Sequence, residues 1–75
     1  MSLCSLPVGT EAKITKICGE TSVIKRLNEL GFTTGTTIKI IRGEDLKGPV
    51  LVEVRDSRIM LGNDVATKIT VDEVK

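Results

Sequence analysis

The ten residues RLNELGFTTG, at positions 26–35, carry the clearest structural signal in the sequence. Leu27 and Leu30 continue an apolar spacing of i, i+1, i+4 and i+7 that starts one helical turn earlier, which predicts a short amphipathic helix with both leucines in the core. Gly31 predicts the helix end, because glycine readily adopts the left-handed conformation found there. Phe32, the only aromatic residue of the chain, follows directly and is expected to pack against Leu27 in the contact that often accompanies this cap.

The sequence on both sides of this helix alternates between apolar and polar residues, as half-buried β-strands do. The alternation first breaks at Ile17, which predicts a bulge or a strand end near Cys18. Residues 55–58, RDSR, predict a tight turn, and single helical turns are expected near Leu3 and within residues 62–68. Short strands of this kind suit a closed or half-closed barrel, which leaves few strand edges exposed. Strands are predicted around residues 12–17, 36–42, 49–55, 59–61 and 68–74.

Composition limits the classes of function. The chain has 75 residues, so we expect one domain over residues 1–75. Eleven Lys and Arg residues against ten Asp and Glu residues leave a net charge of +1, and the chain has one Phe and no Tyr or Trp. Binding of nucleic acid needs clustered positive charge or stacking aromatics, and is therefore not expected. No apolar stretch approaches the length of a membrane span and no signal peptide is evident, so a soluble, cytoplasmic protein is predicted.

Residues suited to catalysis or cofactor binding are scarce. Histidine is absent, and neither a glycine-rich phosphate loop nor a G-x-S-x-G motif occurs. We therefore predict a protein that is not an enzyme and carries no cofactor. Direct metal binding would rest on Cys4 and Cys18, with Met60 as a soft ligand, and the spacing of the cysteines does not fit a structural zinc site. Each thiol is expected to be a small, half-buried apolar group, and no metal-ligating residues are assigned.

The central segment and the strands around it resemble the FeoA family, small cytoplasmic accessory proteins of the bacterial ferrous-iron transporter FeoB. The resemblance covers essentially the whole chain, and its most specific part is the pattern R-L-x-E-L-G-x-x-x-G. Asp56 departs from the family, where many members have glycine, and so does Gly62, where many have arginine. The matching residues are Arg26, Leu27, Glu29, Leu30, Gly31 and Gly35, together with Lys47, Gly48, Pro49 and Arg58.

This resemblance implies a mainly β fold, a small five-stranded SH3-like barrel with one short α-helix. It also implies an adaptor role, in which the protein binds the cytosolic, GTP-binding region of FeoB and reaches the membrane only through that partner. Weak self-association is compatible with this role. The alternative is a stand-alone metal-responsive module that binds a divalent transition metal ion and is similar to the SH3-like domain of iron-dependent repressors.

Glu29 is the residue that helix energetics explains least. It lies in the last turn of the predicted helix, where a negative charge meets the negative end of the helix dipole at a cost of about 0.3–1 kcal/mol. Pairing with Lys25 or Arg26 offsets about 0.2–0.5 kcal/mol per pair. A partner contact is therefore our hypothesis for the helix end and the loop after it, with the charged segment 43–48 as a second contact. The predicted partner-binding residues are Arg26, Glu29, Phe32, Thr33, Thr34 and Lys47.

Overall fold

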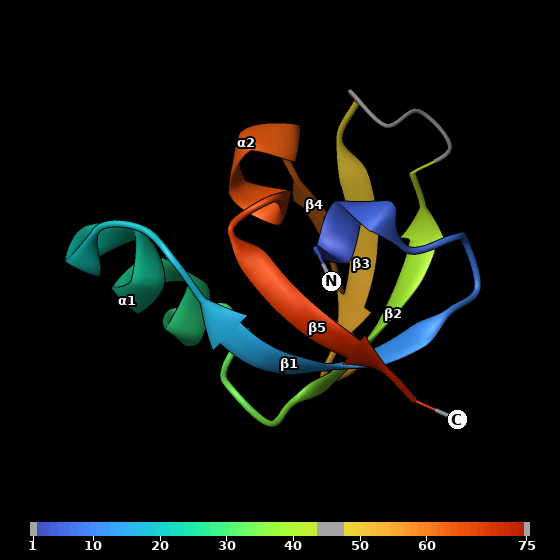
Figure 1. The fold of residues 1–75 in the computed structure, drawn as a ribbon, viewed down its shortest axis with the longest axis horizontal. Helices are drawn as coiled ribbons and strands as arrows, with labels where there is room; N and C mark the ends of the chain where they lie inside the picture. The colour runs from blue at the N-terminus through green and yellow to red at the C-terminus, as the bar shows by residue number, and fades with distance from the viewer. Residues whose placement is uncertain (1, 44–47, 75) are drawn as a thin grey trace.

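One antiparallel sheet of five strands, in the order β4-β3-β2-β1-β5, forms the frame of the protein (Figure 1). The computed structural model describes residues 2–43 and 48–74. The mainly β architecture with a short helix, predicted from the alternation of the sequence, is confirmed. The elements in chain order are η1 (Leu3–Ser5), β1 (Glu11–Ile17), α1 (Thr21–Glu29), β2 (Thr37–Arg42), β3 (Val50–Val54), β4 (Ser57–Leu61), α2 (Asn63–Ala66) and β5 (Ile69–Glu73).

Two irregularities in strand pairing let this sheet curl. The register between β1 and β5 shifts between Ile14 and Lys16, and the register between β2 and β3 shifts between Ile40 and Arg42. Bulges of this kind bend the strand and increase its local twist. Strand β1 ends at Ile17, so the strand end predicted near Cys18 is confirmed, and the bulge between Ile14 and Lys16 is an additional irregularity earlier in the strand.

The outer edges of the two edge strands, β5 and β4, differ in how far the rest of the chain covers them. On β5, Thr70 forms a bridge with Ser2, so the N-terminal segment covers part of that edge. Strand β4 pairs with β3 along its whole length, and no described strand pairs with its other edge. An open strand edge offers unpaired backbone N–H and C=O groups to a second chain.

The core is a single cluster of fifteen buried apolar side chains, and no polar or charged side chain of the described residues is buried with them. Alternate strand residues supply most of it, while Leu3 and Ala66 add to it from η1 and α2, as the predicted helical turns suggested. Phe32 is among the largest side chains with no exposed area. Leu30, which the spacing predicts in the core, is instead 42% exposed. This prediction was wrong, and the outward position of Leu30 matters for the site described below.

Helix α1 ends as its sequence predicts. Gly31 has a φ of 106°, its N–H donates to the carbonyl of Asn28 at 3.1 Å, and the N–H of Phe32 donates to the carbonyl of Leu27 at 2.9 Å. These two bonds are those of a Schellman cap, which satisfies the free carbonyls of the last turn. Because Leu27 and Phe32 both lie in the core cluster, the cap also fixes α1 against the sheet. The predicted helix stop and the predicted pairing of Phe32 with Leu27 are confirmed.

The turn between β3 and β4 packs beside this helix end. Arg55 and Asp56 form a two-residue turn with φ of 49° and 67°, the left-handed conformations that a type I′ hairpin requires. The tight turn predicted from RDSR is thus confirmed, with Asp56 at a position that glycine would occupy without strain. A Cβ placed on Gly31 would lie 3.5 Å from Cδ of Arg55, so the stem of this arginine covers the helix cap.

Candidate docking site

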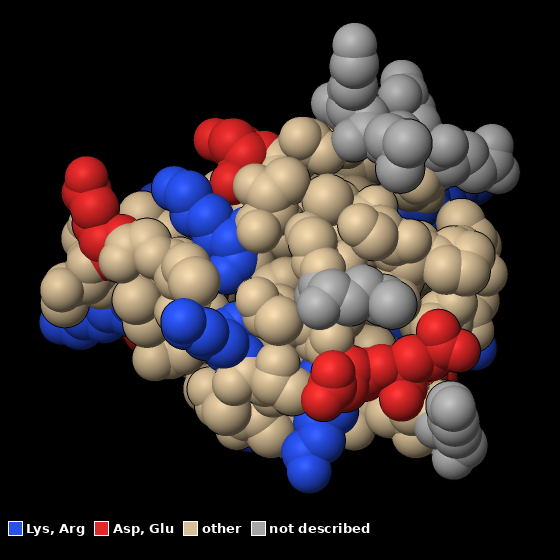
Figure 2. Space-filling view, viewed as in Figure 1, with Lys and Arg blue, Asp and Glu red and all other residues tan. Residues whose placement is uncertain are grey.

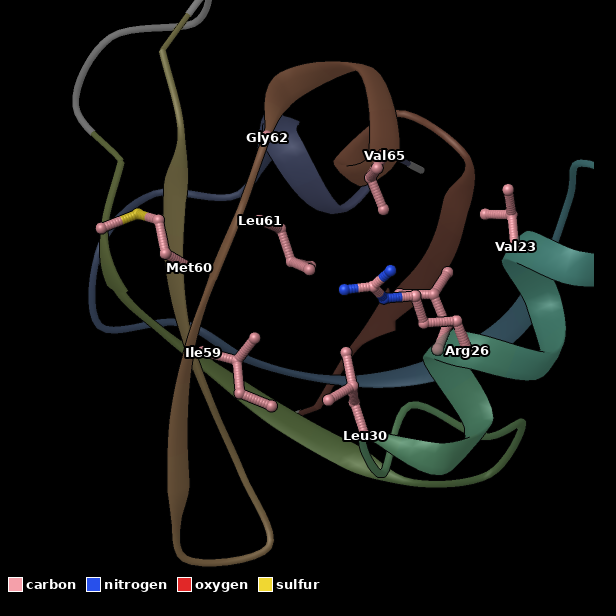
Figure 3. Close-up of a pocket in the computed structure, with 9 residues that line it drawn as sticks. Val23, Arg26, Leu30, Ile59, Met60, Leu61, Gly62 and Val65 are labelled. Carbon is pink, nitrogen blue, oxygen red and sulfur yellow. The ribbon is translucent and has the colours of Figure 1, made fainter.

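A groove of about 350 Å³ lies between helix α1 and strand β4 (Figure 3). We call it the α1–β4 groove. Most of the side chains around it are apolar, so it resembles a docking surface for another chain more than a polar catalytic cleft. It is lined by Val23, Arg26, Leu27 and Leu30 from α1 and its cap, by Ile59, Met60, Leu61 and Gly62 from β4 and its end, and by Val65 from α2.

The helical wall of the groove follows from the way α1 is anchored. The Schellman cap and the burial of Leu27 fix the rotation of the helix. Leu30 is three residues further on, which places it about 60° around the helix axis from Leu27. It therefore leaves the core and faces β4 across the groove (Figure 3). Helix α1 itself stands to one side of the sheet (Figure 1).

The opposite wall is the end of β4. Ile59 and Leu61 are alternate residues of the strand, so they share one face, and both side chains point into the groove (Figure 3). Leu61 is buried and Ile59 is half-buried, while the side chain of Met60 points away and is 56% exposed. Met60 therefore lines the groove with its main chain. Val65 reaches in from α2 and closes one end.

Arg26 is the charged residue of this apolar groove. Its guanidinium extends from α1 toward the centre of the groove (Figure 3). Within residues 2–43 and 48–74 it makes no ion pair and no side-chain hydrogen bond, whereas Arg58 on β4 is paired with Glu53 at 3.5 Å. A guanidinium offers five N–H donors in a planar fork that matches a carboxylate. The side chain is thus placed to receive an acidic group from outside.

The predicted partner-binding residues are only partly brought together. Arg26 and Glu29 share a second, more open hollow on α1, and Glu29 is exposed there with no ion pair to a described residue. Thr34 is exposed in the loop after the helix, while Thr33 is half-buried and its hydroxyl lies 2.6 Å from that of Thr36. Phe32 has no exposed area, so its side chain cannot touch a partner in this fold. We correct the assignment of Phe32 to the contact surface for that reason.

Lys47 and most of the charged segment 43–48 lie outside the described residues. The groove itself was not predicted from the sequence, although one signal pointed to it. The apolar stripe of α1 includes one leucine more than the core accommodates.

The two cysteines have different surroundings. Cys4 is half-buried against the core and its Sγ lies 3.2 Å from Oγ of Ser2, as expected for a small apolar thiol. Cys18 is exposed, which differs from the expectation. Among the described residues, no three Cys, Asp or Glu side chains come together as a group that could hold a metal ion.

Charges of both signs are mixed on the surface. Figure 2 shows Lys and Arg side chains scattered over this face without a continuous basic patch, while acidic side chains gather toward the C-terminus. Asp72 and Glu73 on β5 and Glu11 on the paired strand β1 are all exposed. In the parts of the chain that the structure describes, no helix is long and apolar enough to cross a bilayer.

Comparison of the sequence with known proteins points to one family. The family model of the FeoA domain matches residues 1–73 of this chain. An Fe(2+) transport protein A/Fe(2+) transporter FeoB fusion protein from Porphyromonas gingivalis is 33% identical over 72 residues, which are 96% of this chain and 8% of that protein. The chain thus spans less than a tenth of that relative. A Methanocaldococcus jannaschii relative with the provisional name Fe(2+) transport protein A is 31% identical over 67 residues, 89% of this chain and 79% of the relative.

Solved structures agree with this assignment and with the predicted fold. The crystal structure of Stenotrophomonas maltophilia FeoA complexed with zinc, described as a prokaryotic SH3 domain protein, has a TM-score of 0.82 and 30% identity, and the match covers 96% of this chain and 89% of that chain. The predicted SH3-like fold is therefore confirmed. A manganese-dependent transcriptional repressor matches with a TM-score of 0.89 over 99% of this chain and 41% of its own, at 15% identity, which shows a shared fold alone. The chain belongs to the FeoA domain family.

Proposed function

We propose that this protein is a non-enzymatic, cytoplasmic accessory protein of ferrous-iron uptake that binds the cytosolic, GTP-binding region of FeoB as a single domain. The observation that carries the proposal is the Porphyromonas gingivalis relative, in which a similar domain and FeoB are named as parts of one fusion protein. Membership of the FeoA family supports the link to Fe(2+) transport. The apolar α1–β4 groove supports a binding role over a catalytic one.

The fusion protein also indicates why a domain that is not joined to FeoB needs binding affinity of its own. Two domains joined in one chain meet at an effective concentration in the millimolar range for short flexible linkers, and therefore need little affinity of their own. A domain that is not joined to its partner lacks that advantage and must bind through an interface with affinity of its own. The exposed residues of the helix end, Arg26, Glu29 and Thr34, and the α1–β4 groove beside them are the surfaces that we propose for this purpose.

Reversal of the charge at Glu29 tests the helix end. Glu29→Lys places a positive charge at the negative end of the helix dipole, so the free energy of unfolding is expected to rise by about 0.3–1 kcal/mol. Binding to the FeoB cytosolic region is expected to weaken about fivefold or more, because a favourable contact across the interface becomes a like-charge or unpaired one. Urea denaturation measures the first effect, and calorimetric titration measures the second.

Glu20→Lys is the matched control for this variant. Glu20 precedes the first residue of α1, is exposed, and undergoes the same change of charge at the opposite end of the helix. Its affinity for FeoB is expected to stay within about twofold of the unmodified protein, because a distant exposed charge is screened by salt. Wild-type affinity in a folded Glu29→Lys variant would remove the helix end from the interface.

Direct metal sensing is the second candidate function. It is favoured by the zinc complex of the Stenotrophomonas maltophilia relative. The residues that would carry it in this chain are Cys4 and Cys18, and Cys18 is the accessible one. Thiolates suit soft and borderline divalent ions such as zinc and ferrous iron.

Titration of the reduced protein with Fe²⁺ under anaerobic conditions separates the two candidates. Metal sensing predicts a saturable one-to-one heat at micromolar protein, which Cys18→Ser should abolish. The adaptor function predicts no saturable heat in either protein. A one-to-one heat that survives Cys18→Ser would place a metal site on residues other than the exposed thiol.

A further inference from the structure

We propose that the α1–β4 groove receives an extended segment of the partner, which pairs as an additional strand with the open edge of β4 and places a carboxylate on Arg26. The choice of FeoB as the partner rests on the proposed function. The mode of binding rests on the groove, on the strand edge and on the guanidinium of Arg26, which has no partner among the residues that the structure describes.

The hydrogen-bonding capacity of the β4 edge follows from its register. Val54 and Ser57 flank a two-residue turn and face each other, so they form a hydrogen-bonded pair, and alternate pairs along the ladder do the same. The backbone groups of Ser57, Ile59 and Leu61 therefore point toward β3. Those of Arg58 and Met60 point to the other side, where no strand of the described chain pairs with them. Added strands on an open sheet edge use this arrangement.

Apolar side chains on both walls of the groove determine which residues of the incoming segment face inward. Leu30 on the helix wall is 42% exposed, and Ile59 opposite it is half-buried, so both lose water when the groove is filled. Side chains of an extended segment point alternately to its two faces. Every second residue of the partner segment would therefore lie between these two walls, and apolar residues at those positions are expected.

Arg26 specifies the charge of the occupant. Its guanidinium lies over the groove without a described partner, while the nearby Arg58 is already paired with Glu53. A carboxylate brought into the groove would form charge-assisted hydrogen bonds with the planar fork of the guanidinium, which are stronger than neutral ones. A basic segment would be repelled there. The occupant is therefore an extended apolar segment that carries an Asp or Glu.

A helical occupant fits the groove less well. A helix has no free N–H or C=O groups along its length, so it would cover the outward groups of Arg58 and Met60 and leave them unpaired. Buried backbone groups without a partner are costly. An extended segment satisfies these groups and fills the groove at once.

Amide exchange in the ¹⁵N-labelled protein distinguishes these modes, with the purified cytosolic region of FeoB as the probe. In the free protein, the amides of Arg58 and Met60 should exchange rapidly, because they point away from β3. In the complex their exchange is expected to slow at least tenfold. The amides of Ile59 and Leu61, already bonded to β3, serve as internal references and should change little. Binding that shifts the groove resonances without protecting Arg58 and Met60 would overturn strand addition.

Two substitutions test the charge. Arg26→Ala is expected to weaken binding at least tenfold, and Arg26→Lys should recover part of the loss, since it keeps the charge but not the fork. Lys16→Ala is the control, because Lys16 is exposed on β1 and its loss changes the net charge equally. Its affinity should stay within twofold. Equal losses in Arg26→Ala and Lys16→Ala would show general electrostatic attraction and overturn the assigned role of Arg26.

The outcomes separate this inference from the proposed function. Binding to FeoB that is sensitive to Glu29→Lys, but leaves Arg58 and Met60 unprotected and tolerates Arg26→Ala, would overturn the groove mode and keep the adaptor function. Absence of any binding by the unmodified protein would overturn the adaptor function and, with it, this occupant.

Discussion

Phe32→Ala is expected to lower the free energy of unfolding by about 3–5 kcal/mol. Phe32 is the only aromatic residue of the chain and has no exposed area. Its removal leaves a cavity between the sheet and the helix cap and also withdraws the side chain that fixes Leu27. A domain of this size has a total stability of roughly 4–11 kcal/mol at about 0.05–0.15 kcal/mol per residue. The expected loss is therefore a large share of the total stability of the domain.

Equilibrium denaturation in urea, followed by far-UV circular dichroism, measures this effect. Phe32→Leu is the control, because it keeps an apolar side chain of intermediate volume, and a loss of about 1–2 kcal/mol is expected for it. A loss below about 1 kcal/mol for Phe32→Ala would contradict the position of Phe32 at the centre of the core, since full burial of a phenylalanine contributes more than that.

The helix end could be predicted from the sequence because its determinants are local. Gly31 is the residue that best adopts a positive φ, and Leu27 and Phe32 are close enough in sequence for one Schellman cap to bring them together. The RDSR turn was equally local, since two residues between alternating segments leave few backbone conformations. In both cases a few neighbouring residues determine the conformation, whatever the rest of the chain does.

The position of Leu30 could not be predicted in the same way. Helical periodicity places Val23, Leu27 and Leu30 on one stripe, but it does not say how much of that stripe the sheet can cover. That depends on where β4 ends relative to α1, more than twenty residues away in sequence. The burial of Leu30 therefore depends on tertiary packing. The sequence pattern correctly predicted an apolar face on the helix, but it wrongly placed Leu30 in the core.

The candidate site was predicted in part for a related reason. Glu29 and Arg26 stand out in the sequence because helix energetics does not account for the glutamate. The groove beside them combines residues of α1 with residues of β4 and α2, and the free edge of β4 follows from the order of the strands. No periodicity within one segment reveals either feature. Strand order and the spacing between elements had to be known before Arg26 could be placed in an apolar groove.

Leu27 and Leu30 lie three residues apart at the end of one helix. Their substitution by alanine is expected to lower the free energy of unfolding by very different amounts. Leu27→Ala removes a side chain that is 3% exposed and should cost about 2–5 kcal/mol of stability. Leu30→Ala removes one that is 42% exposed and should cost about 0.5 kcal/mol or less. Since alanine is the best helix former, neither value should contain a penalty from helix propensity.

Binding to the FeoB cytosolic region should reverse this order. Leu30 is a wall of the α1–β4 groove that a partner covers, so folded Leu30→Ala is expected to lose about 1–2 kcal/mol of binding free energy, roughly a five- to thirtyfold weaker affinity. Leu27→Ala, studied at low temperature where it remains folded, should lose less affinity than Leu30→Ala, because Leu27 is 3% exposed and offers a partner little surface in the groove. If Leu30→Ala instead lost several kcal/mol of stability, Leu30 would be a core residue as its spacing suggests, and the groove would be filled in solution by the chain itself. Normal stability together with normal binding would leave the groove intact but place the partner elsewhere on the protein.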